Sequence, residues 1–536
     1  MKNFLERFDS LADIKTENIF ARWLERASFV FIILMFVSEP HSIAATQIAW
    51  LTGMFLWVVR LFLKLRPRLV RTPLDVALWA FFGWSVITSI FSYAPDISID
   101  RLRGTLLFLI FYYVVNVVRT KRAAIFLASA MIFSCMVNVV WTPIQRLIGR
   151  GVEIHGVAPD SPLTKARLME GDALLEANGV KLKTPDDLIA QIERNEITKV
   201  KFYRPDFDFI VDVRRDDLLG GENALERLGI DGWKRSRNWR STGFYSHYVT
   251  YSEVLQLIAS LVFGLFIASL GNKFLSRKQR SAEESNQSEQ QIVVAPTRRF
   301  AASLLAVCLA GMLLALLLTV TRSSELGFLI SAVAVVIANG NRRLLLGLAV
   351  IILPLAIGGL IFLQQSRHVG MFDQKDDSTL YRETMYQDGV RLWTSSPRHF
   401  FIGVGMDSVQ RYWRDWNLYD GGKLPMGHFH STPLQLLVER GLPALLIWLW
   451  ILWIYARTLL RYLKFQIADS KIDWREKGIV LGSFGGMIGF FTSGLVQYNL
   501  GDAEVAMAFF MLMGLSLSIT RFQITNVFTS DSIRSL

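Results

Sequence analysis

The sequence predicts an all-α polytopic membrane protein that carries one small inserted α/β domain. Of its 536 residues, 52% are hydrophobic, which is more than a soluble globular chain usually contains. The apolar residues gather in runs of about twenty, the length of helix that crosses the hydrocarbon core of a bilayer. Residues of about 148–216 break this pattern with short alternating segments, so they are expected to form a separate folded domain.

About twelve apolar runs are long enough, or nearly so, to cross the membrane as helices. The first, fourth and eighth runs are short or carry charge at one end, which makes the number approximate. The runs are roughly 21–38, 43–64, 73–92, 103–118, 122–143, 248–270, 300–319, 324–339, 344–363, 435–457, 477–496 and 502–520.

The formal net charge of +12 does not indicate a nucleic-acid partner, because most Lys and Arg lie in short clusters between apolar runs. Such clusters orient helices in a membrane. The loop 60–71 holds five basic residues, whereas the loops 38–42 and 497–502 hold none. This alternation predicts a bacterial inner-membrane protein with both termini in the cytoplasm and its large loops in the periplasm. Cys135 and Cys308 each lie inside an apolar run, so neither a disulfide framework nor a cysteine metal site is expected.

The pattern divides the chain into five parts, and membrane lipids are expected around three of them. The parts are 1–147 with helices one to five, 148–218 as the inserted domain, 219–363 with helices six to nine and a polar cytoplasmic linker at 271–299, 364–434 as a long outer loop, and 435–536 with helices ten to twelve.

The inserted domain combines β-type alternation near 152–154, 173–175, 200–203 and 209–211 with a helical stretch at 185–194. The run Gly156-Val157-Ala158-Pro159-Asp160-Ser161-Pro162, followed by Gly171-Asp172, Asn178-Gly179 and Thr184-Pro185-Asp186-Asp187-Leu188, resembles bacterial PDZ domains in order and spacing. The resemblance implies a groove that captures a peptide end by strand addition. The loop Ile148-Gly149-Arg150-Gly151-Val152 stands where the carboxylate of that peptide would bind, but it lacks the apolar-Gly-apolar form. A peptide or protein ligand and a purely structural lid or docking module both remain open.

Three polar groups lie at the predicted outer face, beside apolar walls where charges need a partner or a ligand. The first is the segment 240–248, which begins with Arg240 and contains His247. The second is Thr321-Arg322-Ser323, between the seventh and eighth helices. The third is the long loop, which contains Arg382 and Gly427-His428-Phe429-His430-Ser431. Arginine and histidine are the residue types that hold an anion and move a proton.

Taken together, these residues resemble the O-antigen ligase and polymerase superfamily of membrane glycosyltransferases, over about 240–520. The resemblance is carried by Thr242-Gly243-Phe244 with His247, Thr321-Arg322-Ser323, Arg382 with Trp393 and Pro397, Gly403-x-Gly405, His428-x-His430-Ser431 and Glu439-x-Gly441-Leu442-Pro443. It implies a helical fold of the GT-C-like kind. It also implies transfer of a glycan from a polyprenyl diphosphate to an acceptor hydroxyl of a lipid or polysaccharide, without cofactor or metal.

By this resemblance, His430 would be the catalytic base and His428 would assist it. Arg322 and Arg382 would hold the diphosphate, and Arg240 and His247 would complete the substrate-binding site. The residue types suit these roles. Guanidinium groups match phosphate oxygens and stay charged, they stabilise the charge that develops on the leaving diphosphate, and an imidazole can take the proton of an incoming hydroxyl.

Other readings of the same residues remain open. Arg322 can pair with Glu325 one helical turn away, and His428 can be a surface loop residue. A metal-dependent route would use Asp206 and Asp208, which have the Asp-x-Asp spacing but fall in the inserted domain, or Asp373, Asp376 and Asp377 in the long loop. Outside the enzyme class, the alternatives are a transporter or flippase of lipid-linked sugars and an envelope scaffold that recruits partners through the inserted domain.

Overall fold

The computed structural model describes residues 2–64, 66–204, 207–237, 239–270, 288–340, 377–422, 424, 427–468 and 473–534. They form two compact units: a helical unit of residues 1–137, 244–316 and 321–536, and a second unit of residues 138–243 and 317–320. The predicted helix 344–363, most of the polar linker and residues 364–376 of the long loop lie outside the described residues.

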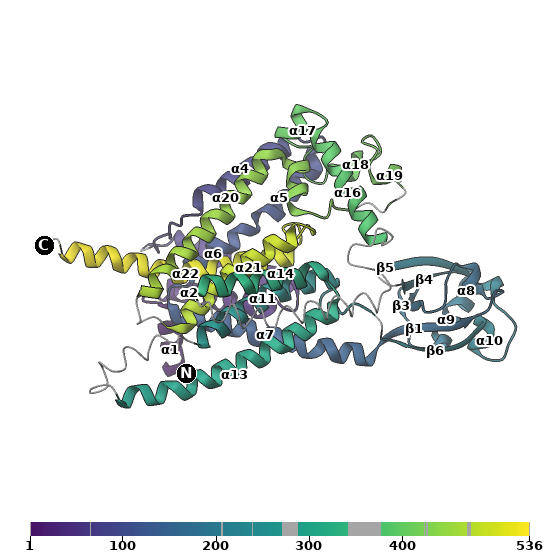
Figure 1. Cartoon of the computed structure of the whole chain (residues 1–536), viewed down its shortest axis with the longest axis horizontal. Helices are drawn as coiled ribbons and strands as arrows, with labels where there is room; N and C mark the ends of the chain where they lie inside the picture. The colour runs from purple at the N-terminus through teal and green to yellow at the C-terminus, as the bar shows by residue number, and fades with distance from the viewer. Residues whose placement is uncertain are drawn as a thin grey trace. The chain divides into compact units, whose positions relative to one another are not determined.

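The helical unit contains most of the chain (Figure 1). Its elements are α1 (Lys2–Ala12), α2 (Ile19–Ser38), α3 (Ile43–Leu61), α4 (Asp75–Ile90), α5 (Pro95–Thr105), η1 (Leu106–Phe108), α6 (Leu109–Val117), most of α7 (Lys121–Ile148), α11 (Tyr248–Leu270), most of α13 (Ser288–Thr319), α14 (Arg322–Asn339), α16 (Asp377–Thr394), α17 (Pro397–Phe401), α18 (Val409–Tyr412), α19 (Tyr419–Gly422), α20 (Thr432–Ala468), α21 (Trp474–Gly494) and α22 (Ala503–Arg534).

Seven helices among the described residues are long and apolar enough to cross a membrane: α3, α7, α11, α13, α14, α20 and α22. This confirms a polytopic membrane protein and seven of the predicted spans. The runs at 21–38 and 477–496 form the helices α2 and α21, and the run at 73–92 forms the shorter apolar helix α4. The predicted helix 103–118 is not continuous, because the chain passes from α5 through the 3₁₀ turn η1 into α6. The total of about twelve spans stays a prediction.

Close contact between glycines and neighbouring backbones joins α11 to α21. A Cβ built on Gly264 of α11 would lie 2.2 Å from the backbone nitrogen of Gly482, and one on Gly478 would lie 2.6 Å from Cα of Leu265. In a bilayer, helices gain little from hiding apolar side chains from lipid, so small residues that let backbones approach supply the packing. The most apolar part of α11 is accordingly 89% buried.

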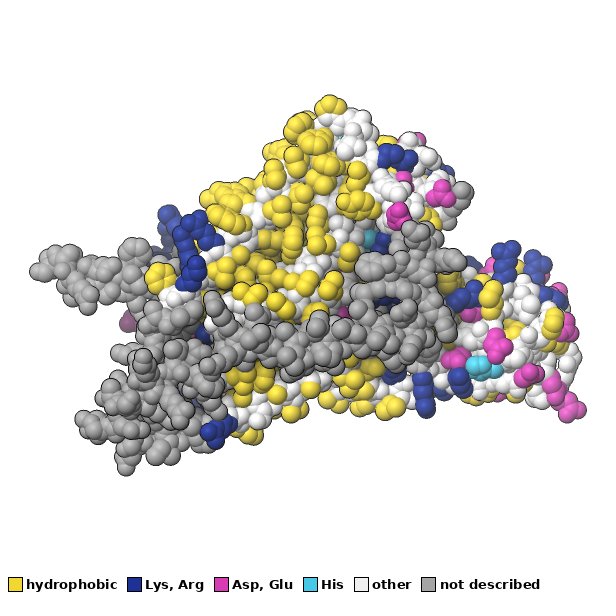
Figure 2. Space-filling view, viewed as in Figure 1, with side chains coloured by type: hydrophobic (Ala, Val, Ile, Leu, Met, Phe, Trp, Pro, Cys, Tyr) yellow, Lys and Arg dark blue, Asp and Glu magenta, His cyan; other side chains and the backbone are white. Residues whose placement is uncertain are grey.

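Apolar side chains remain exposed on the outer helices. Val30 and Leu34 on α2 and Ile48 and Phe55 on α3 are among the large hydrophobic residues open to the surroundings. Figure 2 shows hydrophobic side chains over much of the visible face of the helical unit. A water-soluble monomer rarely exposes so much contiguous apolar surface, so this face is suited to contact with lipid.

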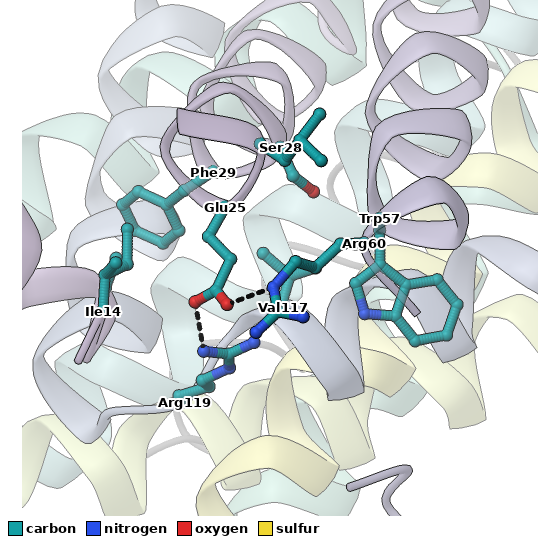
Figure 3. Close-up of a pocket in the computed structure, with 10 residues that line it drawn as sticks. Ile14, Glu25, Ser28, Phe29, Trp57, Arg60, Val117 and Arg119 are labelled. Atoms are coloured by element: carbon teal, nitrogen blue, oxygen red, sulfur yellow. Dashed lines mark hydrogen bonds and ion pairs between the residues drawn. The ribbon is translucent and has the colours of Figure 1, made fainter. Parts of the chain in front are cut away.

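One ion network ties α2 and α3 to the segment after α6 (Figure 3). The buried Glu25 accepts from Arg60 Nε at 2.7 Å and from Arg119 Nη1 at 2.8 Å. The cavity beside it measures only about 10 Å³, which is about the space of one water molecule. We therefore infer that this network stabilises the packing of these helices and does not bind a ligand.

The second unit contains one antiparallel sheet with strand order β5-β4-β2-β1-β6 and with β3 paired to β2. Its elements are β1 (Arg150–Val157), α8 (Pro162–Lys165), β2 (Ala173–Ala177), β3 (Val180–Lys181), α9 (Pro185–Arg194), β4 (Ile197–Arg204), β5 (Phe207–Arg214), η2 (Arg215–Asp217), α10 (Ala224–Leu228) and β6 (Ile230–Ser236). Strands lie at all four predicted places, and α9 has the predicted bounds. The sheet also includes β6, which lies after the predicted boundary at residue 218.

The pairing of β1 changes the expectation for peptide capture. This strand pairs with β2 on one side, where Val152 faces Leu174, and with β6 on the other side, where Ile154 faces Trp233. The loop expected to bind the peptide carboxylate, 148–152, leads into β1, whose residues Val152 and Glu153 pair with β2 on the edge opposite β6. This pairing occupies that edge next to the loop, and peptide capture there stays a prediction.

Candidate functional site

The His-x-His segment is held in place by its neighbours at the start of α20. Ser431 caps the helix by accepting from the Leu434 N–H at 3.4 Å, and Pro433 follows in its first turn, where proline is well tolerated. Thr432 donates through its N–H to Gln497 O at 3.0 Å and through Oγ1 to Asn499 Oδ1 at 2.8 Å. These bonds attach the segment to the turn between α21 and α22.

Phe429 anchors the segment between its two histidines. Its side chain is 2% exposed and packs in a cluster with Met385 and Leu392 of α16 and Leu434 of α20. Its N–H donates to Gln435 Oε1 at 2.9 Å. His430 then has φ +48°, a left-handed conformation that non-glycine residues seldom adopt. Backbone strain of this kind is often found at functional sites.

The first turns of α16 bring Tyr381 and Arg382 to His430. The rings of Tyr381 and His430 lie edge to face with their centroids 5.3 Å apart. Farther along α16, Asp388 Oδ2 accepts from the Tyr419 N–H at 2.8 Å. Tyr419 Oη in turn donates to Gly427 O at 2.9 Å. The arginine of the long loop and the His-x-His segment are thereby joined within one packed cluster.

The segment Gly403-Val404-Gly405 explains two further motifs of the sequence. The N–H of Val404 donates to Val438 O, and the N–H of Gly405 donates to Glu439 O, both at 2.9 Å. A Cβ on Gly403 would lie 2.4 Å from the carbonyl carbon of Glu439, and one on Gly441 (φ +73°) would lie 2.2 Å from Phe401 O. The glycines are therefore required where this segment and α17 lie directly against the bend of α20.

Burial and nearby charges keep both histidines neutral at pH 7. Burial, followed by the positive charge of Arg382, lowers the pKa of His430 to about 4; His428 adds to the shift when it is itself protonated, and a hydrogen bond with Gln497 opposes it. Burial also lowers the pKa of His428, and the charge of Arg101 adds to this, while Asp407 and Asp502 oppose it. Both imidazoles can therefore accept a proton.

A cavity of about 580 Å³ opens beside His428, within the helical unit. Its polar lining includes Arg101, Arg103, Asp407, Glu439 and Arg440. Arg101 forms an ion pair with Asp407, whose N–H donates to Glu439 Oε1 at 2.9 Å. His428 lines this space, and its ring lies 5.1 Å, centroid to centroid, from the ring of Tyr498.

The remaining predicted site residues lie on other elements. Arg322 is the first residue of α14, with Thr321 at the N-cap. Since the helix dipole disfavours a cation there but favours an anion, this position suits phosphate binding. His247 precedes α11 and its Nδ1 accepts from the Val249 N–H at 3.3 Å. Arg240 belongs to the second unit. Arg322, His247 and Arg240 are not among the groups whose charge shifts the pKa of His430; those groups are Arg382 and His428.

Two arginines of the long loop have local partners. Arg391 donates to Asp388 Oδ1 at 2.6 Å and to Asn417 O at 2.8 Å. Arg398 lies over the ring of Tyr93, with its guanidinium carbon 3.9 Å from the centroid, and donates to Phe91 O.

No group of three or more His, Cys, Asp or Glu residues is placed to hold a metal ion in the part of the chain that the structure describes. Asp206, Asp373 and Asp376 lie outside that part.

Several residues of this region were not singled out from the sequence. Asp407, Arg440, Gln497 and Tyr498 come from three separate segments, and no local motif marks them. Glu439 was visible only as part of the Glu-x-Gly-Leu-Pro motif. Arg101 had a weak signal, because it is a basic residue next to a predicted outer loop, whereas the short outer loops 38–42 and 497–502 carry none.

Comparison with known families supports the resemblance that the sequence indicated. Residues 306–449 match the family described as O-Antigen ligase. The matched segment contains Arg322, Arg382, His428 and His430, whereas Arg240 and His247 precede it. No curated protein matches the whole chain or part of it. The chain is thus a multi-pass membrane protein that is similar, over 306–449, to the O-antigen ligase family.

Proposed function

We propose that this protein is a glycosyltransferase that moves a glycan from a polyprenyl diphosphate to an acceptor hydroxyl at the periplasmic face of the inner membrane. The observation that carries the proposal is the neutral His430 held beside the cationic Arg382. A neutral imidazole next to a guanidinium can take a proton while the guanidinium binds an anion. The family match over the same residues supports a role in O-antigen or polysaccharide assembly.

The proposed reaction exchanges one bond at the anomeric carbon of the donor sugar. The acceptor hydroxyl gives its proton to His430 as its oxygen forms a bond to the anomeric carbon of the donor sugar. The bond from that carbon to the diphosphate oxygen breaks, and its electron pair stays on the diphosphate. Arg382, with Arg322 at the start of α14, stabilises the charge that develops on this leaving group. The proton on His430 then passes to solvent.

Donor binding would also strengthen the base. In the free protein, the low pKa of His430 makes the neutral form available but weakly basic. A diphosphate at Arg382 offsets the positive charge that disfavours the imidazolium, so the pKa of His430 rises when donor is present. The base would therefore be strongest when a donor is bound.

The test is transfer from a purified polyprenyl-diphosphate glycan by the full-length protein. Replacing His430 by Ala should lower turnover about a hundredfold or more, the usual contribution of a general base, while donor binding persists. Arg382→Lys keeps the charge but loses the planar fork, so it should weaken both donor binding and turnover. The matched control is Arg391→Lys on the same helix, because Arg391 is bound to Asp388 and Asn417.

Full activity of both His430→Ala and Arg382→Lys would discard the site. Loss of activity with a chelator would favour a metal route through Asp373, Asp376 and Asp377. Sidedness is tested separately with single cysteines at the exposed positions Asn178 and Gly421. An impermeant thiol reagent should label both in intact spheroplasts, and labelling only after lysis would reverse the proposed orientation.

A second candidate function, peptide binding by the second unit, is favoured by the position of β6. Among the described strands, β6 lies at one edge of the sheet. It begins at Ile230, the last residue of Leu228-Gly229-Ile230, an apolar-Gly-apolar sequence with Gly229 at φ +62°. An extended peptide can pair with such an edge. Lys234→Pro would remove one N–H from β6, and peptide binding measured by fluorescence polarisation should fall if strand addition occurs at this edge.

A further inference from the structure

The last turns of α7, which belong to the second unit, carry an exposed apolar stripe. Ile144, Leu147 and Ile148 lie on one face of the helix, and they are 41%, 67% and 56% exposed. The helix has 28 residues, which cover about 42 Å, whereas the hydrocarbon core of a bilayer is about 30 Å thick. The end of α7 therefore reaches the head-group region, where apolar side chains can contact lipid.

Four arginines surround this end of α7. Arg146 donates through Nε to Arg237 O at 3.1 Å. Arg235 donates through Nη2 to the backbone carbonyl oxygen just before Arg150, at 3.3 Å. Arg150 begins β1, which continues from α7 (Figure 1), and it pairs with Ser236 of β6. The pairing brings two short segments together, and we call their arginines the basic cluster: Arg146, Arg150, Arg235 and Arg237.

The positive charge of the basic cluster is poorly compensated. Among the described residues, Asp208 is the one carboxylate within ion-pair distance of the cluster, at 3.9 Å from Arg150. It lies closer to a lysine of β4, at 3.1 Å. Arg146 and Arg235 donate to backbone carbonyl oxygens, and Arg237 is exposed. Four cations thus share part of one anion, so the cluster attracts negative charge.

Aromatic rings hold one of these cations in place. The guanidinium carbon of Arg150 lies 4.4 Å from the ring centroid of Trp239 and 4.7 Å from that of Tyr203. Stacking of this kind orients a guanidinium without neutralising it. Trp and Tyr are also the residue types that gather where a protein crosses the membrane–water interface. The surroundings of the cluster are therefore suited to the head-group region.

Membrane orientation does not account for the basic cluster. Lys and Arg normally gather in the cytoplasmic loops, whereas the sequence predicts that this end of α7 faces the periplasm. A soluble anion would explain the arginines but not the apolar stripe beside them. A surface with arginines on one side and aliphatic side chains on the other gains both from apolar burial in the bilayer and from attraction to anionic lipids.

We propose that the basic cluster and the apolar stripe bind an anionic phospholipid of the leaflet that the end of α7 reaches. The acyl chain lies against Ile144, Leu147 and Ile148, and the head-group phosphate lies among the arginines. The bound lipid holds the base of the second unit at the membrane surface. Neither feature includes a residue assigned to glycan transfer, so this inference stands independently of the proposed function.

The binding test uses phosphatidylglycerol with a diazirine on its head group, in nanodiscs that contain the full-length protein. Cross-links mapped by mass spectrometry should fall on residues 144–150 and 232–240. Unlabelled phosphatidylglycerol should compete, whereas phosphatidylcholine, which has no net charge, and soluble glycerol phosphate should compete poorly. Absence of cross-links from both segments would overturn the proposal. Equal competition by phosphatidylcholine or by glycerol phosphate would overturn it as well, the latter in favour of a soluble anion.

Substitutions at exposed positions separate lipid binding from a change in the fold. Arg237→Gln should lower the apparent affinity for phosphatidylglycerol about fivefold, the contribution of one arginine near an anionic membrane. Arg237→Lys keeps the charge and should bind as the wild type does. Leu147→Gln removes an apolar contact and should also weaken binding.

The matched control is Arg194→Gln, because Arg194 is an exposed arginine at the end of α9 in the same unit. Its labelling should equal that of the wild type. Unchanged labelling in both Arg237→Gln and Leu147→Gln would overturn the proposal. An equal fall in Arg194→Gln would do the same, because it would show that any lost charge on this unit has the effect.

Discussion

The pKa of His430 offers a direct test of the electrostatics of the candidate site. In the protein it falls from an ordinary 6.5 to about 4, which corresponds to about 3 kcal/mol against protonation. Burial is the largest cause and the charge of Arg382 is the second. Replacing Arg382 by Gln removes only the second cause, so we expect the pKa of His430 to rise above about 4 while burial keeps it below its ordinary 6.5.

The assay is histidine C2 hydrogen–deuterium exchange read by mass spectrometry across pH 3–8, because the exchange rate reports imidazole protonation at each histidine. The direction of the pKa shift of His430 can also be checked by measuring thermal stability as a function of pH. Between pH 4 and 6.5 the unfolded chain binds a proton that folded His430 does not, so thermal stability should rise with pH over this window and level off above it. Arg382→Gln should make this rise shallower.

Arg391→Gln is the matched control, because Arg391 lies on the same helix but is not among the charges that act on His430. A midpoint that stays near 4 in Arg382→Gln would refute the reasoning. So would an equal shift in Arg391→Gln, since that would point to a general change in the fold. Addition of a polyprenyl diphosphate should raise the midpoint of the wild-type protein, because the anion offsets the charge of Arg382.

Three further predictions concern packing, the ion network and metals. Gly441→Ala would place a Cβ 2.2 Å from Phe401 O at φ +73°, so it should lower the thermal unfolding midpoint and the transfer rate. Gly83→Ala, with open space around its Cβ, should leave both unchanged, and an equal loss in both variants would contradict the packing argument. Glu25→Gln should destabilise the protein by about 3 kcal/mol, as expected when one partner of a buried pair is removed. The KM for donor should stay unchanged. Unfolding at the wild-type midpoint would show that the hydrogen bonds of Glu25 with Arg119 and Arg60 do not stabilise the fold. Transfer activity should be the same with and without EDTA if arginines, rather than a metal, stabilise the charge on the leaving diphosphate. A chelator-sensitive rate would argue for a metal.

The elements of the second unit show which parts of the fold were readable from local pattern. Alternation placed β1, β2, β4 and β5, and the helical stretch at 185–194 placed α9, which the structure shows to begin with a capping box at Thr184. These signals act over a few residues, so they survive without knowledge of the rest of the chain. β6 was missed because its sequence, Ile-Asp-Gly-Trp-Lys-Arg-Ser, has a central glycine and little alternation. Its partner β1 lies more than seventy residues earlier.

The membrane helices show the same division. Apolar length predicted the seven helices that qualify as spans, because a bilayer imposes a length that sequence alone can meet. Length did not predict the break at η1. Nor did it predict the close contact of α11 with α21, which depends on glycines that face each other across two helices.

In the candidate site, the sequence by itself determined the chemistry at hand: an arginine on the long loop, an arginine at a helix start, and a His-x-His pair beside a long apolar run. The match to the O-antigen ligase family covers these same residues. Only the tertiary structure decided how they act. It buried His430 beside Arg382, which lowers the pKa of that imidazole, it gave His247 a local role at the start of α11, and it opened a cavity lined by residues from Gln47 to Phe510. The physical reason is that burial and Coulomb interactions depend on distances between segments that are remote in sequence, whereas local pattern reports only which groups are available.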